Sequence, residues 1–196
     1  ADVFNYYYTN IKTADPTAKV TGPSILNWDF TCIDCQGRSL CEGETGTGYQ
    51  CGKVWLKEFI GAYETTFGEK PPVDVWAIDV YPLDWENTPN NDPGRLATYD
   101  GQAVLHSYVA TEQIRRMRQY LDTFPEYADT PIWITEIAVH VGYGFGQSPR
   151  DGWHWLNSPT QIAPDGPYRW SKMSNYLNEV LDWLETNSVS KRVERW

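Results

Sequence analysis

Glu136 ends a short apolar segment, residues 131–135, whose β-branched and aromatic side chains predict a strand buried within a sheet. A carboxylate at the tip of such a strand is costly to bury, and packing does not explain it. In α/β enzymes the carboxyl ends of parallel strands carry the reactive groups. A structural alternative is that Glu136 caps the following loop or pairs with Arg150. The position favours chemistry, so Glu136 is our candidate for a catalytic carboxylate.

Motifs of several other enzyme classes are missing from the sequence. It has no Gly-x-Ser-x-Gly and no histidine pair with zinc-protease spacing. No Gly-x-Gly-x-x-Gly and no Walker loop follows a predicted strand. These absences disfavour a serine hydrolase, a zinc protease and a nucleotide-binding enzyme.

All four cysteines, Cys32, Cys35, Cys41 and Cys51, lie in one predicted loop. They predict either two disulfides or one structural zinc site with four thiolate ligands. An exported protein favours the disulfides. A zinc ion held by four thiolates has no open coordination position, so neither alternative supplies a catalytic cofactor.

Helices and strands alternate in the predicted order of elements. Apolar residues at helical spacing predict helices at 2–13, 53–67, 103–124 and 168–186, and apolar runs predict strands at 19–26, 73–81, 131–136 and 189–196. Strict alternation predicts a parallel α/β sheet with right-handed crossovers. The loops after strands are long, above all residues 140–167, so the working surface is expected at the carboxyl ends of the strands.

The composition narrows the class of partner. A net charge of -10 and a pI near 4.7 disfavour nucleic acid, and no apolar stretch is long enough to predict a membrane span. Aromatic residues make up 15% of the chain, with 10 Trp and 13 Tyr, and such rings can stack on sugars or fill a core. We expect a single domain over residues 1–196, truncated at both ends because Ala1 lies within an apparent helix and Trp196 within an apparent strand.

Four segments in order resemble the second half of the clan A retaining glycoside hydrolases. They are residues 15–20 (DPTAKV), 73–81 (VDVWAIDVY), 132–136 (IWITE) and 192–196 (RVERW). The resemblance implies a half or partial (β/α)8 barrel of the TIM type, with these strands as the fifth to eighth. It also implies that Glu136 is the nucleophile. The family's acid/base Glu follows an Asn at the end of strand four, and no Asn-Glu pair lies at a predicted strand end in this sequence.

The resemblance also gives roles to residues near Glu136. Tyr81 is expected to hydrogen-bond and orient the nucleophile, whereas Asp79 replaces a histidine that is common in the clan. Asp29 and Asp79 could each donate a proton or, more simply, bind a sugar hydroxyl. Trp76 and Trp133, within strands, are expected in the core. The predicted substrate-binding residues are Asn27, Trp28, Asp29, Trp85, His140, Trp153, Trp155 and Trp196.

We therefore expect a secreted glycosidase that cleaves a β-linked poly- or oligosaccharide with retention of configuration. Its acid/base carboxylate is expected outside the chain, and no cofactor is expected for catalysis beyond the possible structural zinc. The alternative is a non-catalytic carbohydrate-binding or inactive half-barrel fragment. Because four strands cannot close a barrel, the chain is expected to self-associate or to pair with a missing N-terminal half. Another hydrolase on the same scaffold, such as a deacetylase, also stays open.

Overall fold

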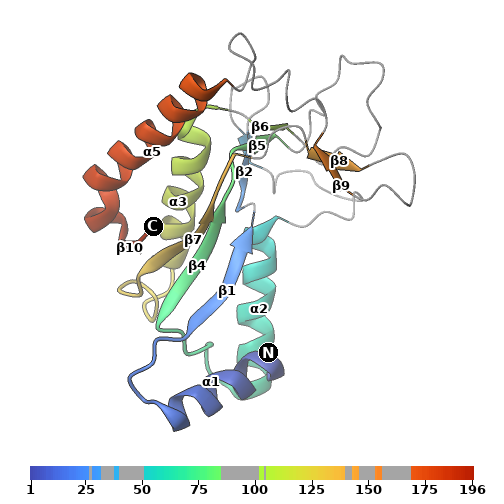
Figure 1. Ribbon diagram of the computed structural model, residues 1–196. Coiled ribbons are helices and arrows are strands. Elements are labelled where there is room, and N and C mark those ends of the chain that lie inside the picture. Colours follow the sequence, from blue (N-terminus) through green and yellow to red (C-terminus); the bar gives the residue numbers. More distant parts are fainter. Residues whose placement is uncertain are drawn as a thin grey trace.

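The computed structural model describes residues 1–26, 28–31, 38–39, 51–84, 102–103, 105–139, 143–145, 153–155 and 169–196. Its main elements are four helices and a sheet of four parallel strands (Figure 1). The helices are α1 (Asp2–Ala14), α2 (Gly52–Phe67), α3 (Ser107–Leu121) and α5 (Trp170–Lys191). The sheet strands are β1 (Thr21–Leu26), β4 (Val75–Val80), β7 (Ile132–Ile137) and β10 (Val193–Arg195). No described helix is both long and apolar enough to cross a membrane.

The sheet has the order β1-β4-β7-β10, so strands that follow one another in the chain are neighbours. All three pairings are parallel, and a helix connects each strand to the next. The predicted parallel α/β arrangement is therefore confirmed. In Figure 1 the arrows of β1, β4 and β7 lie side by side and point the same way.

One core joins α2, α3 and α5 to a single face of the sheet. Each of these three helices contributes apolar side chains three or four residues apart, the spacing that puts them on one side of a helix. Helix α1 has no buried residue. The core includes Leu56 and Ile60 of α2, Ile114, Met117 and Leu121 of α3, Tyr176, Val180 and Leu184 of α5, and Trp76, Ile78, Ile132 and Ile134 of the sheet. The opposite side of the sheet, called the open face below, carries Ser24, Asp79, Trp133, Thr135 and Glu194. The prediction that Trp76 is a core residue is confirmed.

The end of the chain differs from the prediction. Helix α5 continues to Lys191, five residues beyond its predicted end, and β10 begins only at Val193. Val189 was expected in the strand, but it is 91% exposed within the helix. Arg192 ends the helix in the left-handed conformation with φ 53°, and its amide is bonded to the carbonyls of Ser188 and Val189. Val189 suggested a strand because valine is β-branched. In the structure its side chain is exposed on the last turns of α5, so its residue type did not indicate the local structure.

Each long loop after β1, β4 and β7 contains a short antiparallel pair that was not predicted. The pairs are β2 (Phe30–Thr31) with β3 (Arg38–Ser39), β5 (Leu83–Asp84) with β6 (Gln102–Ala103), and β8 (Tyr143–Phe145) with β9 (Trp153–Trp155). The pairs β5–β6 and β8–β9 lie beyond the carboxyl ends of the sheet strands (Figure 1). The unpredicted pairs thus follow the strand ends, at the end of the sheet where Glu136 lies.

Candidate active site

Strands β4 and β7 bring Asp79, Tyr81 and Glu136 together at their carboxyl ends. Asp79 and Glu136 are directly paired positions on neighbouring parallel strands, and such strands lie about 4.8 Å apart. Tyr81 follows the last residue of β4 by one position. Two carboxylates and one phenol therefore share one end of the sheet.

A bulge in β7 sets the direction of these side chains. Ile78 pairs with Ile134, but the next residue of β4, Asp79, pairs with Glu136, so Thr135 is an extra residue on β7. Successive residues of a regular strand point to opposite faces. Here Ile134 is buried, whereas Thr135 and Glu136 are both exposed. The bulge thus keeps Glu136 out of the helix-covered core, and bulges commonly re-aim side chains beside active sites.

The Tyr81 hydroxyl donates a hydrogen bond to Glu136 Oε2. Burial raises the pKa of Tyr81 to about 12, with further contributions from the hydrogen bond to Glu136 and from the charges of Glu136 and Asp79. The phenol therefore stays protonated at neutral pH and can only donate to the carboxylate. The buried Gln113 of α3 donates from Nε2 to the Tyr81 carbonyl at 3.2 Å, which fixes the backbone of Tyr81. Nothing in the sequence pattern had indicated this role for Gln113.

Asp79 belongs to a second group of polar side chains on the open face. Its Oδ1 lies 2.7 Å from Ser24 Oγ of β1 and 2.7 Å from Thr135 Oγ1 of β7. The two hydroxyls are themselves 2.8 Å apart. Neither Ser24 nor Thr135 was predicted as a site residue, because short hydroxyl side chains carry no signal of function in a sequence.

Two predicted substrate-binding residues face the helices instead. Trp28 is 0% exposed and its ring lies 5.6 Å from that of Tyr120, so no face of the indole is open to a sugar. The Asp29 side chain is 4% exposed and lies between Lys53 of α2, at 3.4 Å, and Arg116 of α3, at 3.7 Å. The expectations of sugar contact by Trp28 and of sugar contact or proton donation by Asp29 are therefore wrong in this structure.

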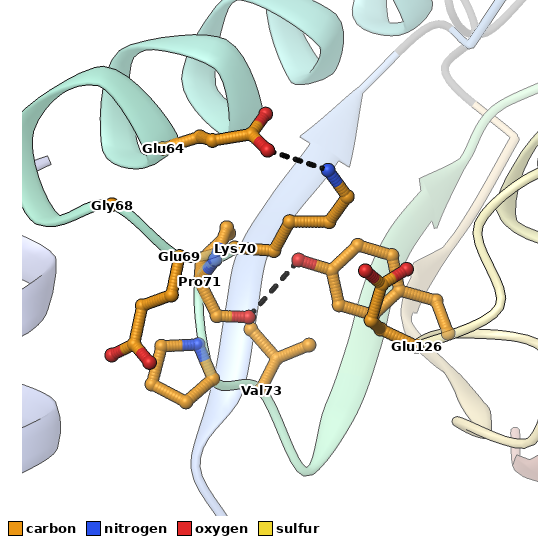
Figure 2. Close-up of a pocket in the computed structure, with 9 residues that line it drawn as sticks. Glu64, Gly68, Glu69, Lys70, Pro71, Val73 and Glu126 are labelled. Atoms are coloured by element: carbon orange, nitrogen blue, oxygen red, sulfur yellow. Dashed lines mark hydrogen bonds and ion pairs between the residues drawn. The ribbon is translucent and has the colours of Figure 1, made fainter.

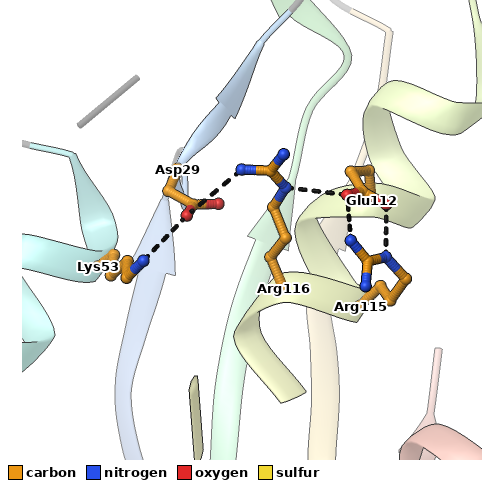
Figure 3. Close-up of polar contacts among 5 residues, drawn as sticks. All are labelled: Asp29, Lys53, Glu112, Arg115 and Arg116. Atoms are coloured by element: carbon orange, nitrogen blue, oxygen red, sulfur yellow. Dashed lines mark hydrogen bonds and ion pairs between the residues drawn. The ribbon is translucent and has the colours of Figure 1, made fainter. Parts of the chain in front are cut away.

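The surroundings of Asp29 form a network of charges (Figure 3). Arg116 also contacts Glu112 at 2.9 Å, and Glu112 contacts Arg115. Burial raises the pKa of Asp29, although the positive charges of Arg116 and Lys53 lower it. Because α2 and α3 both contact Asp29, the network joins helices rather than serving the open face.

Trp133 was expected in the core but lies on the open face. Its Nε1 donates to Glu194 Oε2 at 2.8 Å, and the Arg195 guanidinium lies 4.4 Å from its ring centre. Lys19 Nζ lies 3.0 Å from the same Glu194 oxygen and 5.8 Å from the ring. The hydrogen bonds from Trp133 and Lys19 lower the pKa of Glu194. The strand alternation that buries Ile132 and Ile134 places Trp133 opposite them.

Other predicted residues are only partly covered by the structure. Trp196, which follows β10, is 50% exposed. The backbones of Trp153 and Trp155 form β9. Asn27, Trp85 and His140 lie outside the described residues, as do Cys32, Cys35 and Cys41. Cys51 is buried before α2 and is disulfide-bonded. No group of three or more potential metal ligands occurs among the described residues.

A cavity of about 470 Å³ lies at the other end of β4 (Figure 2). It is lined by the turn after α2, residues 68–73, together with Glu64, Glu126 and Tyr127. Lys70 is 3.1 Å from Glu64, and the Tyr127 hydroxyl donates to the Pro71 carbonyl at 3.0 Å. These contacts hold the turn that leads into β4. The cavity is at the amino end of the strands, away from Glu136.

Comparison with known protein families identifies a glycosyl hydrolase family. Residues 97–196, just over half of the chain, match the family described as the glycosyl hydrolase catalytic core. The matched segment includes β7 with Glu136 and extends to the end of β10. Comparisons with curated proteins and with solved structures give no match. The chain belongs to the glycosyl hydrolase catalytic core family.

Proposed function

We propose that this protein is a glycosidase that cleaves a β-linked poly- or oligosaccharide with retention, and that Glu136 is its nucleophile. The observation that carries the proposal is the exposed Glu136 carboxylate at the tip of β7, which accepts a hydrogen bond from a phenol that stays protonated at neutral pH. The hydrogen bond orients one carboxylate oxygen and leaves the other for attack. Membership of the glycosyl hydrolase catalytic core family supports the same class of reaction.

In the proposed reaction a Glu136 oxygen attacks the anomeric carbon, and the bond to the leaving-group oxygen breaks. A carboxylic acid about 5–5.5 Å from the nucleophile protonates that oxygen, and as a carboxylate it then deprotonates the water that hydrolyses the glycosyl-enzyme. The clan A resemblance gives this second role to a Glu at the end of barrel strand four. None of β1, β4 and β10 ends in a Glu. The acid/base carboxylate is therefore expected on a barrel strand other than β1, β4, β7 and β10.

We further propose that the sheet is half of a (β/α)8 barrel, with β1, β4, β7 and β10 as strands five to eight. The consecutive strand order and the placement of long loops at the carboxyl ends support this proposal. Lys19, which precedes one edge strand, forms an ion pair with Glu194 of the other edge strand across the open face. A flat sheet would separate these strands by three spacings, about 14 Å. The contact is as expected for a sheet that curves toward this face.

We also propose that tryptophans following the sheet strands bind the sugar units of the substrate. Trp196 is proposed as a stacking platform because the residue is half exposed directly after β10. The tryptophans of the other loops, Trp85, Trp153 and Trp155, are proposed as further platforms.

The disulfide at Cys51 supports the disulfide alternative for the cysteines, and disulfides are typical of the secreted location that we propose.

Hydrolysis assays with three proteins test the proposal. Wild type, Glu136→Gln and the control Glu185→Gln would be assayed on aryl β-glycosides and on β-linked polysaccharides. Glu185 is exposed on α5 and lies outside the site. Loss of the nucleophile is expected to lower kcat/KM by about 1,000-fold or more, whereas the control keeps wild-type turnover. Wild-type turnover by Glu136→Gln would contradict the assignment.

The carbohydrate-binding alternative is kept because no described residue has the expected place of the acid/base. It predicts sugar binding without turnover in wild type. Calorimetry with the polysaccharides used in the assay would detect such binding. Turnover by wild type rules this alternative out, and the absence of both binding and turnover rules out both functions.

A further inference from the structure

The group formed by Ser24, Asp79 and Thr135 lies directly beside the proposed nucleophile. Asp79 is the strand partner of Glu136, and its charge contributes to the raised pKa of Tyr81, so it lies close to both groups. Ser24 and Thr135 reach Asp79 from the strands on either side of β4. The orienting contact between Tyr81 and Glu136 involves none of the three side chains. The group therefore has no role in the reaction as proposed above.

The number of hydroxyl protons determines what the group can do. Ser24 and Thr135 each have one proton. The two hydroxyls have four oxygen contacts, three within the group and one of 3.3 Å from Thr135 Oγ1 to the Ile78 carbonyl, so at most two of the four are hydrogen bonds donated by these hydroxyls at one time. Donation of both protons to Asp79 Oδ1 uses the two contacts of 2.7 Å and leaves the 2.8 Å contact without a proton. Within the described part of the chain, no hydrogen bond reaches Asp79 Oδ2. One oxygen is thus held in place, and the other keeps its capacity to accept.

The charges around Asp79 indicate what kind of ligand fits. Within the ranges that the structure describes, no lysine or arginine forms an ion pair with Asp79 or Glu136. Two acidic side chains without such a partner disfavour an anionic sugar and favour a ligand that brings hydrogen-bond donors. The hydroxyls of a neutral sugar are such donors. A ring in position for attack by Glu136 would also lie next to the strand partner of Glu136.

We propose that Asp79 Oδ2 accepts a hydrogen bond from a ring hydroxyl of the neutral sugar unit held against Glu136. Ser24 and Thr135 are positioning residues that fix the Asp79 carboxylate through Oδ1. The inference rests on the proposed function and makes Asp79 a determinant of sugar specificity. Because the bulge at Thr135 allows this residue and Glu136 to face outward together, one irregularity of β7 serves both carboxylates.

A double-mutant cycle between protein and substrate tests the inference. The aryl β-glycoside that wild type cleaves best would be compared with its monodeoxy analogues, each of which lacks one ring hydroxyl. Wild type is expected to lose about 10- to 100-fold in kcat/KM on one analogue, as for loss of a hydrogen bond to a charged group. Asp79→Asn replaces the accepting Oδ2 with an NH2 group, and it is expected to discriminate against that analogue much less than wild type. Asp182 is exposed on α5, so Asp182→Asn is the matched control. It is expected to discriminate among the analogues as wild type does.

Positioning by Thr135 has its own test. Thr135→Val removes the donated proton and is expected to reduce the discrimination between the parent sugar and the same analogue, whereas Thr135→Ser is expected to restore it. A merely structural defect would lower kcat/KM for all substrates alike and leave their ratio unchanged. Thermal unfolding of each variant identifies any that fails to fold, in which case Ser24→Ala provides the second test of positioning.

Several results would overturn the inference. Equal losses by Asp79→Asn on the parent sugar and on every analogue would show that Asp79 accepts no substrate hydroxyl. A loss on 4-nitrophenyl glycosides that disappears with 2,4-dinitrophenyl glycosides would show that Asp79 is instead the proton donor. If wild type cleaves no glycoside, the proposed function fails by itself. Calorimetry of wild type and Asp79→Asn with methyl β-glycosides then decides the inference, which fails if wild type does not bind or if the variant binds equally well.

Discussion

At the scale of single residues, the proposed function depends on the state of one hydrogen bond. Tyr81 donates to Glu136, and its pKa of about 12 keeps the phenol neutral over the range in which glycosidases work. The Glu136 side chain is therefore ordered by Tyr81, and no lysine or arginine among the described residues forms an ion pair with it. A neutral donor orients the nucleophile without supplying a full positive charge.

Replacing Tyr81 by Phe is expected to lower kcat/KM on an aryl β-glycoside by about 10- to 100-fold, because the carboxylate loses a charge-assisted hydrogen bond. Tyr63→Phe is the matched control, since its hydroxyl donates to Asn5 at 2.8 Å in the contact between α1 and α2. The control is expected to change stability but not turnover. Equal activity of Tyr81→Phe and wild type would remove Tyr81 from the site.

Asp29 gives a prediction about pH and stability. Because burial raises its pKa in the folded protein, folding favours the neutral acid, and this contribution is complete below the ordinary value of 3.8 and is lost as the pH rises through the folded pKa. The free energy of unfolding of wild type relative to Asp29→Asn is therefore expected to fall as the pH rises above 3.8. Urea unfolding at a series of pH values measures the difference.

Asp15 is the control of opposite sign for this experiment. Hydrogen bonds from the Thr17 side chain and backbone lower its pKa, so its contribution is present above 3.8 and is lost as the pH falls through the folded pKa. The difference between wild type and Asp15→Asn should therefore increase with rising pH. The same slope for both variants would contradict the assignment of burial as the dominant effect on Asp29.

The sequence could predict only part of the site at this scale. Glu136 and Tyr81 follow apolar runs, and such runs show where a strand ends. Trp28 and Asp29 follow an equally clear run, but the chain after β1 turns toward the helices, a direction that the local pattern does not contain. The outward position of Thr135 depends on a bulge that is defined by pairing with β4, and pairing is a property of two strands.

At the scale of elements, close contact between strands limits which residues fit. A Cβ at Gly22 of β1 would lie 2.5 Å from Trp76 Cε3, within a ring that is fully buried in the core. The next residue, Pro23, lies within an irregular stretch of the pairing between β1 and β4. The glycine is therefore needed for space, and the proline has no amide proton to leave unpaired.

Gly22→Ala is expected to reduce the free energy of unfolding by about 1–3 kcal/mol, as for overpacking of a rigid core. Gly61→Ala is the matched control, because Gly61 is exposed in α2 and a Cβ there meets nothing within 4 Å. The control should gain about 0.5–1 kcal/mol from the better helix propensity of alanine. Urea unfolding measures both changes, and a neutral Gly22→Ala would show that Trp76 can move.

Element boundaries were predicted well where a sharp local signal exists. Gly68 ends α2 in the left-handed conformation with φ 77°, at the position expected for a C-terminal glycine. The end of α5 has no glycine, and Arg192 takes the left-handed conformation instead, so no residue pattern before Val193 marks the end of the helix. The three hairpins in the loops have paired segments of only two or three residues, too short for a periodic pattern.

At the scale of the whole molecule, the sheet has two edges. Within the described residues, β1 and β10 each pair with one neighbour only, so each presents unpaired backbone groups on its other side. Pro23 weakens one of these edges as a template for pairing. Strict alternation of elements made the parallel sheet predictable from the sequence, whereas what covers its edges depends on surfaces that no local pattern describes.

Self-association is the expected consequence of the open edges. Light scattering at increasing concentrations of the 22.5 kDa chain is expected to give a mass that rises above that of one copy. Val193→Lys would disturb the core, because Val193 is buried. Arg195→Pro removes one backbone donor from the edge strand β10, so it is the better variant and should reduce the mass. A monomer at all concentrations would contradict this expectation.

The central claim, that Glu136 is the nucleophile of a retaining glycosidase, is tested most directly by trapping the covalent intermediate. A 2-deoxy-2-fluoro β-glycoside with a good leaving group should glycosylate the enzyme and slow its own release. Peptide mapping by mass spectrometry is expected to find the sugar on Glu136 in wild type and no adduct in Glu136→Gln. An adduct on a different residue of an active enzyme would contradict the account.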